Sequence, residues 1–349
     1  MAQTLLPLVN QYKLDLKPYV VERLPADCYP APARYEAWSI VDAQQLAAHL
    51  GLAMPKAMRV PDRLSVQMAA LHLSRLENVD QFLKDAVQLG RLVWTNDQAG
   101  IRQICQMADM DDDQIRAGEA ALANLGGFAS GTVAYQGNLY TGVDRLRHFI
   151  SDYVGAKNMA QNPFVPLQDD VPSLETKKKS GTLNVYFSLS CPYSYLMLKR
   201  LEAIANSSSL SITLNPVTSP TVPPRKWRYM LVDCAREAEV RGIPFLTGPL
   251  TLPTEMMVLG TVAKGETVKS GLEQLAYYTR QASQIWAGGS VGAGNAVPPE
   301  RISSIQQKLE ANTKQLRLAG LWGTPSIVVK GVAYWGQDRL DLALSQLQS

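Results

Sequence analysis

The run Cys191-Pro192-Tyr193-Ser194 is the part of the sequence with the clearest chemical potential. It separates a strand-like segment, Leu183–Leu189, from a helix-like segment that begins at Tyr193, and proline suits the first turn of a helix. Cys191 is therefore expected at a helix N-terminus, where unpaired N–H groups and the helix dipole favour a thiolate. A thiolate is the nucleophilic and redox-active form of cysteine, so we expect Cys191 to be reactive, with Ser194 beside it.

The other cysteines and the histidines indicate no second reactive centre. The cysteines lie far apart without a Cys-x-x-Cys pair, so the sequence predicts neither a zinc site nor a disulfide framework, and the thiols should be reduced. Each histidine is isolated, which gives no support to a Ser-His-Asp or metal-dependent hydrolase. We therefore expect no metal site. These residues are Cys28, Cys105, Cys234, His49, His72 and His148.

An internal repeat organises the chain. Gly126–Leu146 aligns without a gap to Gly320–Leu340, and each copy reads as strand, tight glycine turn, strand, glycine and an Asp-Arg-Leu helix start. Helical patterns over Ala31–Leu50 and Arg225–Arg241 also correspond. At the front of the chain, the first copy aligns from Met1 onward with the second copy from Met197 onward.

The first copy therefore begins where the helix after the Cys191 turn is already under way. It lacks the counterpart of the strand Leu183–Leu189 and of the turn itself. Either this copy has degenerated, or a longer product begins upstream of Met1. We favour the longer product, because losing a central strand would expose backbone hydrogen-bonding groups and an apolar face.

The repeat and the local composition suggest domain boundaries. Residues 1–155 form an incomplete first copy, and residues 181–349 form a complete second copy that carries the active site. Between them, residues 156–180 are rich in proline and charge, include a Lys177–Lys179 run and show no periodicity, which indicates a linker.

The arrangement strand, Cys-Pro-x-x, helix, with a Thr324-Pro325 pair heading a later strand, resembles the thioredoxin superfamily. The resemblance implies an α/β fold with two tandem thioredoxin-fold domains, each with a helical insertion. It also implies that Pro325 follows a cis peptide bond and lies against the Cys191 turn, with the backbone at Thr324 available to a thiol substrate.

A narrower resemblance covers nearly all of Gly181–Ser349. The phrases Tyr186–Met197, Lys226–Phe245 and Gly320–Leu340 resemble 2-hydroxychromene-2-carboxylate isomerases, which are related to kappa-class glutathione transferases and more distantly to DsbA. This implies glutathione as the cofactor and a small aromatic or electrophilic molecule as the substrate. The implied glutathione-binding positions are Thr324, Pro325, Gln337 and Asp338, with the carboxylate of Asp338 beside the γ-glutamyl amine or, alternatively, only capping its helix.

One departure from that family leaves the chemistry open. Such isomerases and transferases carry serine where Cys191 stands, whereas DsbA-type enzymes have a second cysteine at the place of Ser194. Cys191 could therefore donate a hydrogen bond to glutathione in an isomerase or transferase. It could instead be a monothiol redox nucleophile that needs an outside thiol for release. A third alternative is a non-catalytic binding protein.

Bulk properties narrow the partners and the location. A net charge of +3 gives no reason to expect nucleic acid, and no stretch has the ~20 apolar residues of a membrane span. The first residues lack the features of a secretory signal, so we expect a cytoplasmic protein. In the first copy Gly131 replaces Pro325, which favours a supporting pseudo-domain packed as an intramolecular pseudo-dimer and leaves homo-oligomerisation open.

Overall fold

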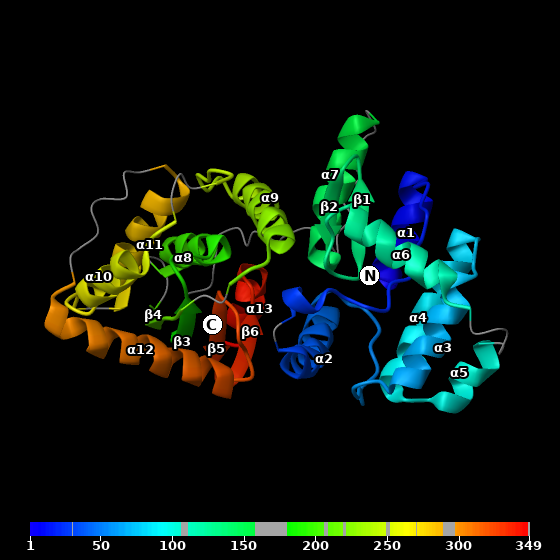
Figure 1. Ribbon diagram of the computed structural model, residues 1–349, viewed down its shortest axis with the longest axis horizontal. Coiled ribbons are helices and arrows are strands. Elements are labelled where there is room, and N and C mark those ends of the chain that lie inside the picture. The colour runs from blue at the N-terminus through cyan, green and yellow to red at the C-terminus, as the bar shows by residue number, and fades with distance from the viewer. Residues whose placement is uncertain are drawn as a thin grey trace. The chain divides into compact units, whose positions relative to one another are not determined.

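The computed structural model describes residues 1–29, 31–105, 111–157, 180–205, 209–218, 221–248, 252–269, 271–288 and 297–347 (Figure 1). Its contacts divide the chain into two units. The first comprises Met1–Gln168 with Pro223–Lys226, and the second comprises Asp169–Val222 with Trp227–Ser349. The core of the expected linker, residues 158–179, lies outside the described residues. Of the described helices, none has the length and apolarity needed to cross a bilayer.

The first unit is mainly helical and contains one hairpin among its described residues. A central core joins α1, the segment after it, α4, the hairpin and α7. The elements are α1 Ala2–Tyr12, α2 Pro32–His49, α3 Arg63–Ser74, α4 Val79–Thr95, α5 Gln98–Ile104, α6 Asp113–Asn124, β1 Thr132–Tyr135, β2 Asn138–Thr141 and α7 Leu146–Ala156.

The second unit is built on a four-stranded mixed sheet of order β4-β3-β5-β6. Strand β3 is central, parallel to β4 and antiparallel to β5, and β5 forms a hairpin with β6. The elements are β3 Ser180–Phe187, α8 Pro192–Ala205, β4 Ser209–Pro216, α9 Pro224–Val240, α10 Glu255–Gly265, α11 Gly271–Trp286, α12 Pro299–Leu318, β5 Ser326–Val329, β6 Val332–Trp335 and α13 Leu340–Ser345.

The strand before Cys191 begins and ends earlier than the segment Leu183–Leu189 that the sequence predicts. Strand β3 begins at Ser180 because its parallel pairing with β4 starts at Ser180 and Ser209, and it ends at Phe187. Residues Leu183, Val185 and Phe187 are completely buried in it, and Tyr186 is also buried. A continuous apolar run is typical of a strand covered on both faces. The helical insertion α9–α12 lies between β4 and β5 in the chain, as expected.

The two hairpins share their local geometry. Their turns, Gln136-Gly137 and Lys330-Gly331, have positive φ at both residues, which is the type I′ geometry that matches the twist of paired strands. After each hairpin comes a positive-φ glycine, Gly142 or Gly336, and then a 3-10 turn that opens the last helix. The sequence repeat is therefore seen as a structural repeat of hairpin, turn and helix.

The described residues of the first unit form a counterpart to only part of the second unit's sheet. Its described residues contain a two-stranded sheet, whereas the second unit has four strands. The α/β fold class is confirmed, but the described residues of the first unit do not by themselves form a thioredoxin domain.

Candidate active site

The end of β3 and the start of α8 position Cys191. The N–H of Cys191 donates to the carbonyl of Ser188 at 3.1 Å, which closes the turn after the strand. The carbonyl of Cys191 then accepts the N–H groups of Ser194 at 3.0 Å and Tyr195 at 3.3 Å. Because α8 begins at Pro192, Cys191 directly precedes the helix, as the sequence predicts.

The Cys191 sulfur faces the start of β5. Its thiol donates to the carbonyl oxygen of Thr324, 3.2 Å away, and the Thr324–Pro325 peptide bond is cis. Only 5% of Cys191 is exposed. Two segments 133 residues apart in the sequence thus meet at the sulfur.

Ser194 lies three residues after Cys191, in the first turn of α8. Its side chain is completely buried, and its Oγ accepts the N–H of Ser188 at 3.2 Å. The hydroxyl also interacts with the sulfur of Cys191. A hydroxyl cannot form a disulfide, so Ser194 holds the turn and polarises the sulfur without offering a second redox group.

The electrostatics at the sulfur differ from the simple expectation for a helix N-terminus. Burial raises the pKa of the Cys191 thiol above its usual value, and this cause outweighs the others. Interactions with the side chains of Thr324 and Ser194 and with the N–H groups of Ser194 and Tyr193 oppose it by lowering that pKa. Cys191 is therefore a neutral thiol near pH 7, and the thiolate expected from the helix start alone is not favoured.

Helix α9 fixes the side chain of Tyr193, the third residue of the motif. The Tyr193 hydroxyl donates to Asp233 at 2.6 Å, and the Tyr229 hydroxyl lies 3.4 Å from the same carboxylate. Asp233 is completely buried. Asp233 belongs to no motif of the sequence; an acidic residue on the inner face of an amphipathic helix is the signal that points to it.

Gln337 and Asp338, the predicted glutathione-binding residues in the last turn, lie in different environments. Gln337 is buried, its side-chain nitrogen donates to Glu237 at 2.6 Å, and its side-chain oxygen accepts from Arg200 at 3.1 Å. The side chain of Asp338 is 21% exposed and lies 3.6 Å from the guanidinium of Arg339. The amide of Gln337 is thus used inside the protein, while Asp338 presents a partly exposed carboxylate.

A hydrogen bond joins this turn to the cis-proline. The N–H of Gly336 donates to the carbonyl of Pro325 at 2.9 Å. The structure therefore connects Cys191, Ser194 and Thr324 directly, and it reaches Gln337 and Asp338 through Pro325 and Gly336.

Two pairs of aromatic side chains lie in the segments around the site. Trp322 and Trp335 are half-buried with ring centroids 4.7 Å apart; Trp322 comes two residues before Thr324, and Trp335 pairs with Ser326 in the hairpin. The indole N–H of Trp286 donates to the carbonyl of Leu189 at 3.0 Å, and Phe245 stacks on this indole at 5.9 Å. The indole of Trp286 thereby anchors the loop that leads to Cys191.

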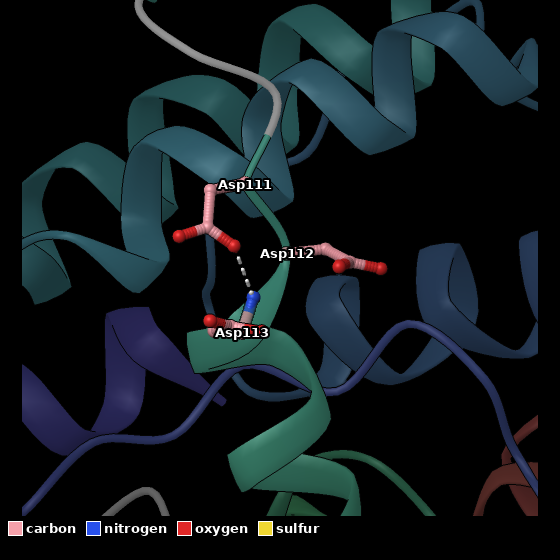
Figure 2. A group of neighbouring side chains, drawn as sticks. All are labelled: Asp111, Asp112 and Asp113. Carbon is pink, nitrogen blue, oxygen red and sulfur yellow. Dashed lines mark hydrogen bonds between the residues drawn. The ribbon is translucent and has the colours of Figure 1, made fainter.

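An acidic group in the first unit has a structural explanation. Within the described ranges, Asp111, Asp112 and Asp113 are the acidic or thiol groups that approach one another closely enough to share an ion (Figure 2). Asp111 accepts the N–H of Asp113 at 3.0 Å, and Arg116 pairs with Asp112 and Asp113. These contacts stabilise the start of α6, where negative charge is favourable.

Comparisons with known proteins address the second unit. Residues 182–289 match the profile of the family described as DSBA-like thioredoxin domain. A selenomethionine structure of 2-hydroxychromene-2-carboxylate isomerase is 22% identical, with a TM-score of 0.37, over 48% of this chain and 94% of that one. The cytosolic disulfide reductase DsbM from Pseudomonas aeruginosa is 17% identical, with a TM-score of 0.33, over 44% and 88%.

A search of curated protein sequences gave no match to this chain. The two structural likenesses are too low to bear on activity, so the family profile and the sheet topology carry the assignment. The second unit therefore contains a DsbA-like thioredoxin domain, whose profile matches residues 182–289, in a chain of mixed α/β structure.

Proposed function

We propose that the second unit is a glutathione-dependent enzyme of the isomerase or transferase type, acting on a small aromatic or electrophilic molecule. The observation that carries this proposal is the state of Cys191. It is a buried thiol with a raised pKa that donates to the carbonyl of Thr324. The single proton of this neutral thiol would move from the Thr324 carbonyl to the sulfur of bound glutathione, so that Cys191 would fill the donor role that the resemblance gives to a serine hydroxyl in such isomerases.

The residues present fit glutathione in part. The N–H groups of Tyr193 and Ser194 act to lower the pKa of the Cys191 thiol, so the helix start can stabilise an anionic sulfur placed there. The partly exposed carboxylate of Asp338 can pair with an ammonium group. The side chain of Gln337 fits less well, because its amide is already bonded to Glu237 and Arg200.

In this mechanism the residues of the chain bind and orient glutathione and the substrate. When bound, glutathione supplies a thiol that becomes a nucleophile as its thiolate. Cys191 and the first N–H groups of α8 hold negative charge on sulfur, and Asp338 holds the amino end. Trp322 and Trp335 offer aromatic surface beside Thr324 for an aromatic substrate. Gln337 acts through the turn as a positioning residue.

A monothiol oxidoreductase is the second candidate, because the N–H groups of Tyr193 and Ser194 act to lower the pKa of Cys191. There the Cys191 thiolate would attack a disulfide and release one thiolate. A second, external thiol would then free Cys191, since Ser194 cannot do so. The raised pKa of Cys191 opposes this chemistry, because it lowers the thiolate fraction at neutral pH.

Substitutions at Cys191 separate the candidates. Cys191→Ser keeps a hydrogen-bond donor and removes redox chemistry, whereas Cys191→Ala removes both. In the proposed enzyme, reduced glutathione raises the melting temperature of wild type and Cys191→Ser, with a smaller rise for Cys191→Ala. Asp338→Asn should reduce the rise as well. Cys234→Ser, at another buried cysteine of the second unit, serves as the control.

Intact-mass analysis after incubation with oxidised glutathione completes the test. Rapid formation of a mixed disulfide between Cys191 and glutathione at pH 7, together with loss of disulfide-reducing activity in Cys191→Ser, would establish the oxidoreductase instead. Absence of any thermal shift at millimolar glutathione, with no adduct, would leave a non-catalytic binding protein.

We also propose that the first unit, over residues 1–155, is a reduced copy of the thioredoxin-fold domain at 181–349. The shared type I′ hairpin and the glycine turn before the last helix support this tandem arrangement. Gly131 stands where the second unit has Pro325, so the first copy has no counterpart of the cis-proline site. The second unit would then carry the chemistry of the chain.

A further inference from the structure

The amine of Lys226 lies against two aromatic rings of the first unit. Lys226 is in the first turn of α9, and the contacts of the chain assign Pro223–Lys226 to the first unit. Its Nζ is 5.7 Å from the centroid of the Tyr29 ring and 5.6 Å from that of the Phe128 ring. The Tyr29 hydroxyl donates to the carbonyl of Phe128 at 3.1 Å, so the two rings are held together as one aromatic wall.

The groups that face this amine are neutral. Nζ donates to the carbonyl oxygen of Cys28 at 3.0 Å. No carboxylate of the described chain pairs with Lys226, and Asp27 lies 3.5 Å from the guanidinium of Arg225 instead. Burial raises the pKa of the Cys28 thiol and of the Tyr29 phenol, so both are uncharged near pH 7. A positive charge on Lys226 therefore has a carbonyl and two rings as its partners in this part of the structure.

This environment makes Lys226 a better nucleophile than an ordinary lysine. Burial lowers the pKa of its ammonium group, and the weaker interaction with Cys28 opposes that change. More of the side chain is therefore the neutral amine at pH 7, which is the form that attacks a carbonyl group. Lys226 is only half-buried, so solvent reaches part of the side chain.

The bonding around Nζ suits a protonated imine. An ammonium group has three N–H donors, whereas the acceptor found for Lys226 within the described ranges is the Cys28 carbonyl. A protonated imine keeps a single N–H, which the same carbonyl can accept. It also keeps a positive charge, which the faces of Tyr29 and Phe128 stabilise. An aromatic group on the imine carbon would gain contact with these rings as well.

We propose that Lys226 forms a reversible imine with a small aromatic aldehyde. The lone pair of the amine adds to the carbonyl carbon, and the carbonyl oxygen leaves as water with the two protons of the amine. A carbon–nitrogen double bond remains, and hydrolysis reverses the reaction. The condensation needs no oxidant or reductant. This site is separate from Cys191 and does not depend on the function proposed for that residue.

The test uses the full-length chain with benzaldehyde as the probe. Timed reactions are quenched with sodium borohydride, which reduces the imine to a stable secondary amine, and the labelled lysines are identified by peptide mass spectrometry. Lys17 is the internal control, because it is exposed and its Nζ lies over a single ring, that of Tyr19, at 5.2 Å. At pH 7 we expect Lys226 to be labelled about fivefold faster than Lys17 or more. The two rates should converge toward pH ~10.4, where an ordinary lysine also loses its proton.

Matched substitutions test the aromatic wall and the site of labelling. Tyr29→Leu removes one ring and keeps apolar cover, whereas Tyr29→Phe keeps the ring and removes the hydroxyl. The preference of Lys226 for benzaldehyde over propanal should fall about threefold or more in Tyr29→Leu and persist in Tyr29→Phe. Lys226→Arg keeps the charge and the donors but cannot condense, so its label should disappear while that of Lys17 remains.

The wild-type chain alone can refute the proposal. Equal labelling of Lys226 and Lys17 at pH 7 would overturn it, as would a ratio of the two rates that does not change with pH. Labelling of Lys17 without labelling of Lys226 would identify a purely structural lysine and also overturn it. Equal preference of Lys226 for propanal and benzaldehyde, each measured relative to Lys17, would overturn the aromatic class of the ligand.

Discussion

The buried network behind the last turn gives the sharpest prediction about stability. Gln337 is 1% exposed and donates to Glu237, which is completely buried. Glu237 also bonds the guanidinium of Arg241 at 3.0 Å, and Arg200 bonds both Gln337 and Asp341. The network joins α8, α9 and α13 around the turn that carries Asp338.

Gln337→Met keeps the size of the side chain and removes its polar atoms. Glu237 loses one donor, and Arg200 loses the side-chain acceptor of Gln337 while keeping its backbone carbonyl. A hydrogen bond to a charged group contributes about 1.5–3 kcal/mol, and the second loss is smaller. We therefore expect the free energy of unfolding of the second unit to fall by about 2–4 kcal/mol.

Urea unfolding followed by tryptophan fluorescence measures this loss. Four tryptophans, Trp227, Trp286, Trp322 and Trp335, lie in the second unit and report on its transition, which is fitted separately because two units need not unfold together. Gln346→Met, at an exposed glutamine of the same unit, is the control and should change the free energy by less than about 0.5 kcal/mol. A loss below about 0.5 kcal/mol for Gln337→Met would refute the network as a stabilising element.

Four further predictions concern Cys191 and the residues around it. Because burial raises the pKa of Cys191, its alkylation by iodoacetamide at pH 7.5, followed by peptide mass spectrometry, should be at least tenfold slower than that of N-acetylcysteine; an equal rate would show an activated thiolate. The contribution of the Cys191 thiol to stability is present below the ordinary thiol pKa and is lost as pH rises through the raised pKa. The free energy of unfolding of wild type, measured by denaturant titration, should therefore fall above about pH 8.5, and that of Cys191→Ser should fall less. Tyr193→Phe should destabilise the second unit by about 1–3 kcal/mol through the lost 2.6 Å bond to Asp233 and more than Tyr229→Phe, whose bond is 3.4 Å; the reverse order in paired melts would contradict the assigned geometry. Gly323→Ala places a Cβ 2.7 Å from the indole of Trp335 and should cost about 1–3 kcal/mol with a shifted emission maximum. Gly248→Ala meets no atom and requires no positive φ, so it should leave the emission unchanged.

Local patterns in the sequence determined the elements of the active site. The apolar run before Cys191, the proline after it and the helical pattern from Tyr193 were sufficient to place Cys191 at a helix start. The glycines at 137, 142, 331 and 336 all have positive φ, which explains why the two hairpins could be aligned from sequence. These features depend on residues that are close together in the chain, so the local sequence is sufficient to predict them.

Tertiary structure decided the properties that depend on residues far apart in the sequence. The pKa of Cys191 is raised because the surrounding fold buries its sulfur, an effect that the helix start alone does not reveal. The amide of Gln337 is engaged by Glu237 and Arg200, which lie 100 and 137 residues away. The amine of Lys226 likewise meets the carbonyl of Cys28, 198 residues away, a proximity that only the folded chain establishes. Burial and long-range hydrogen bonding are properties of the packed chain, so the motif placed Cys191 at the helix start and the fold determined its ionisation and its partners.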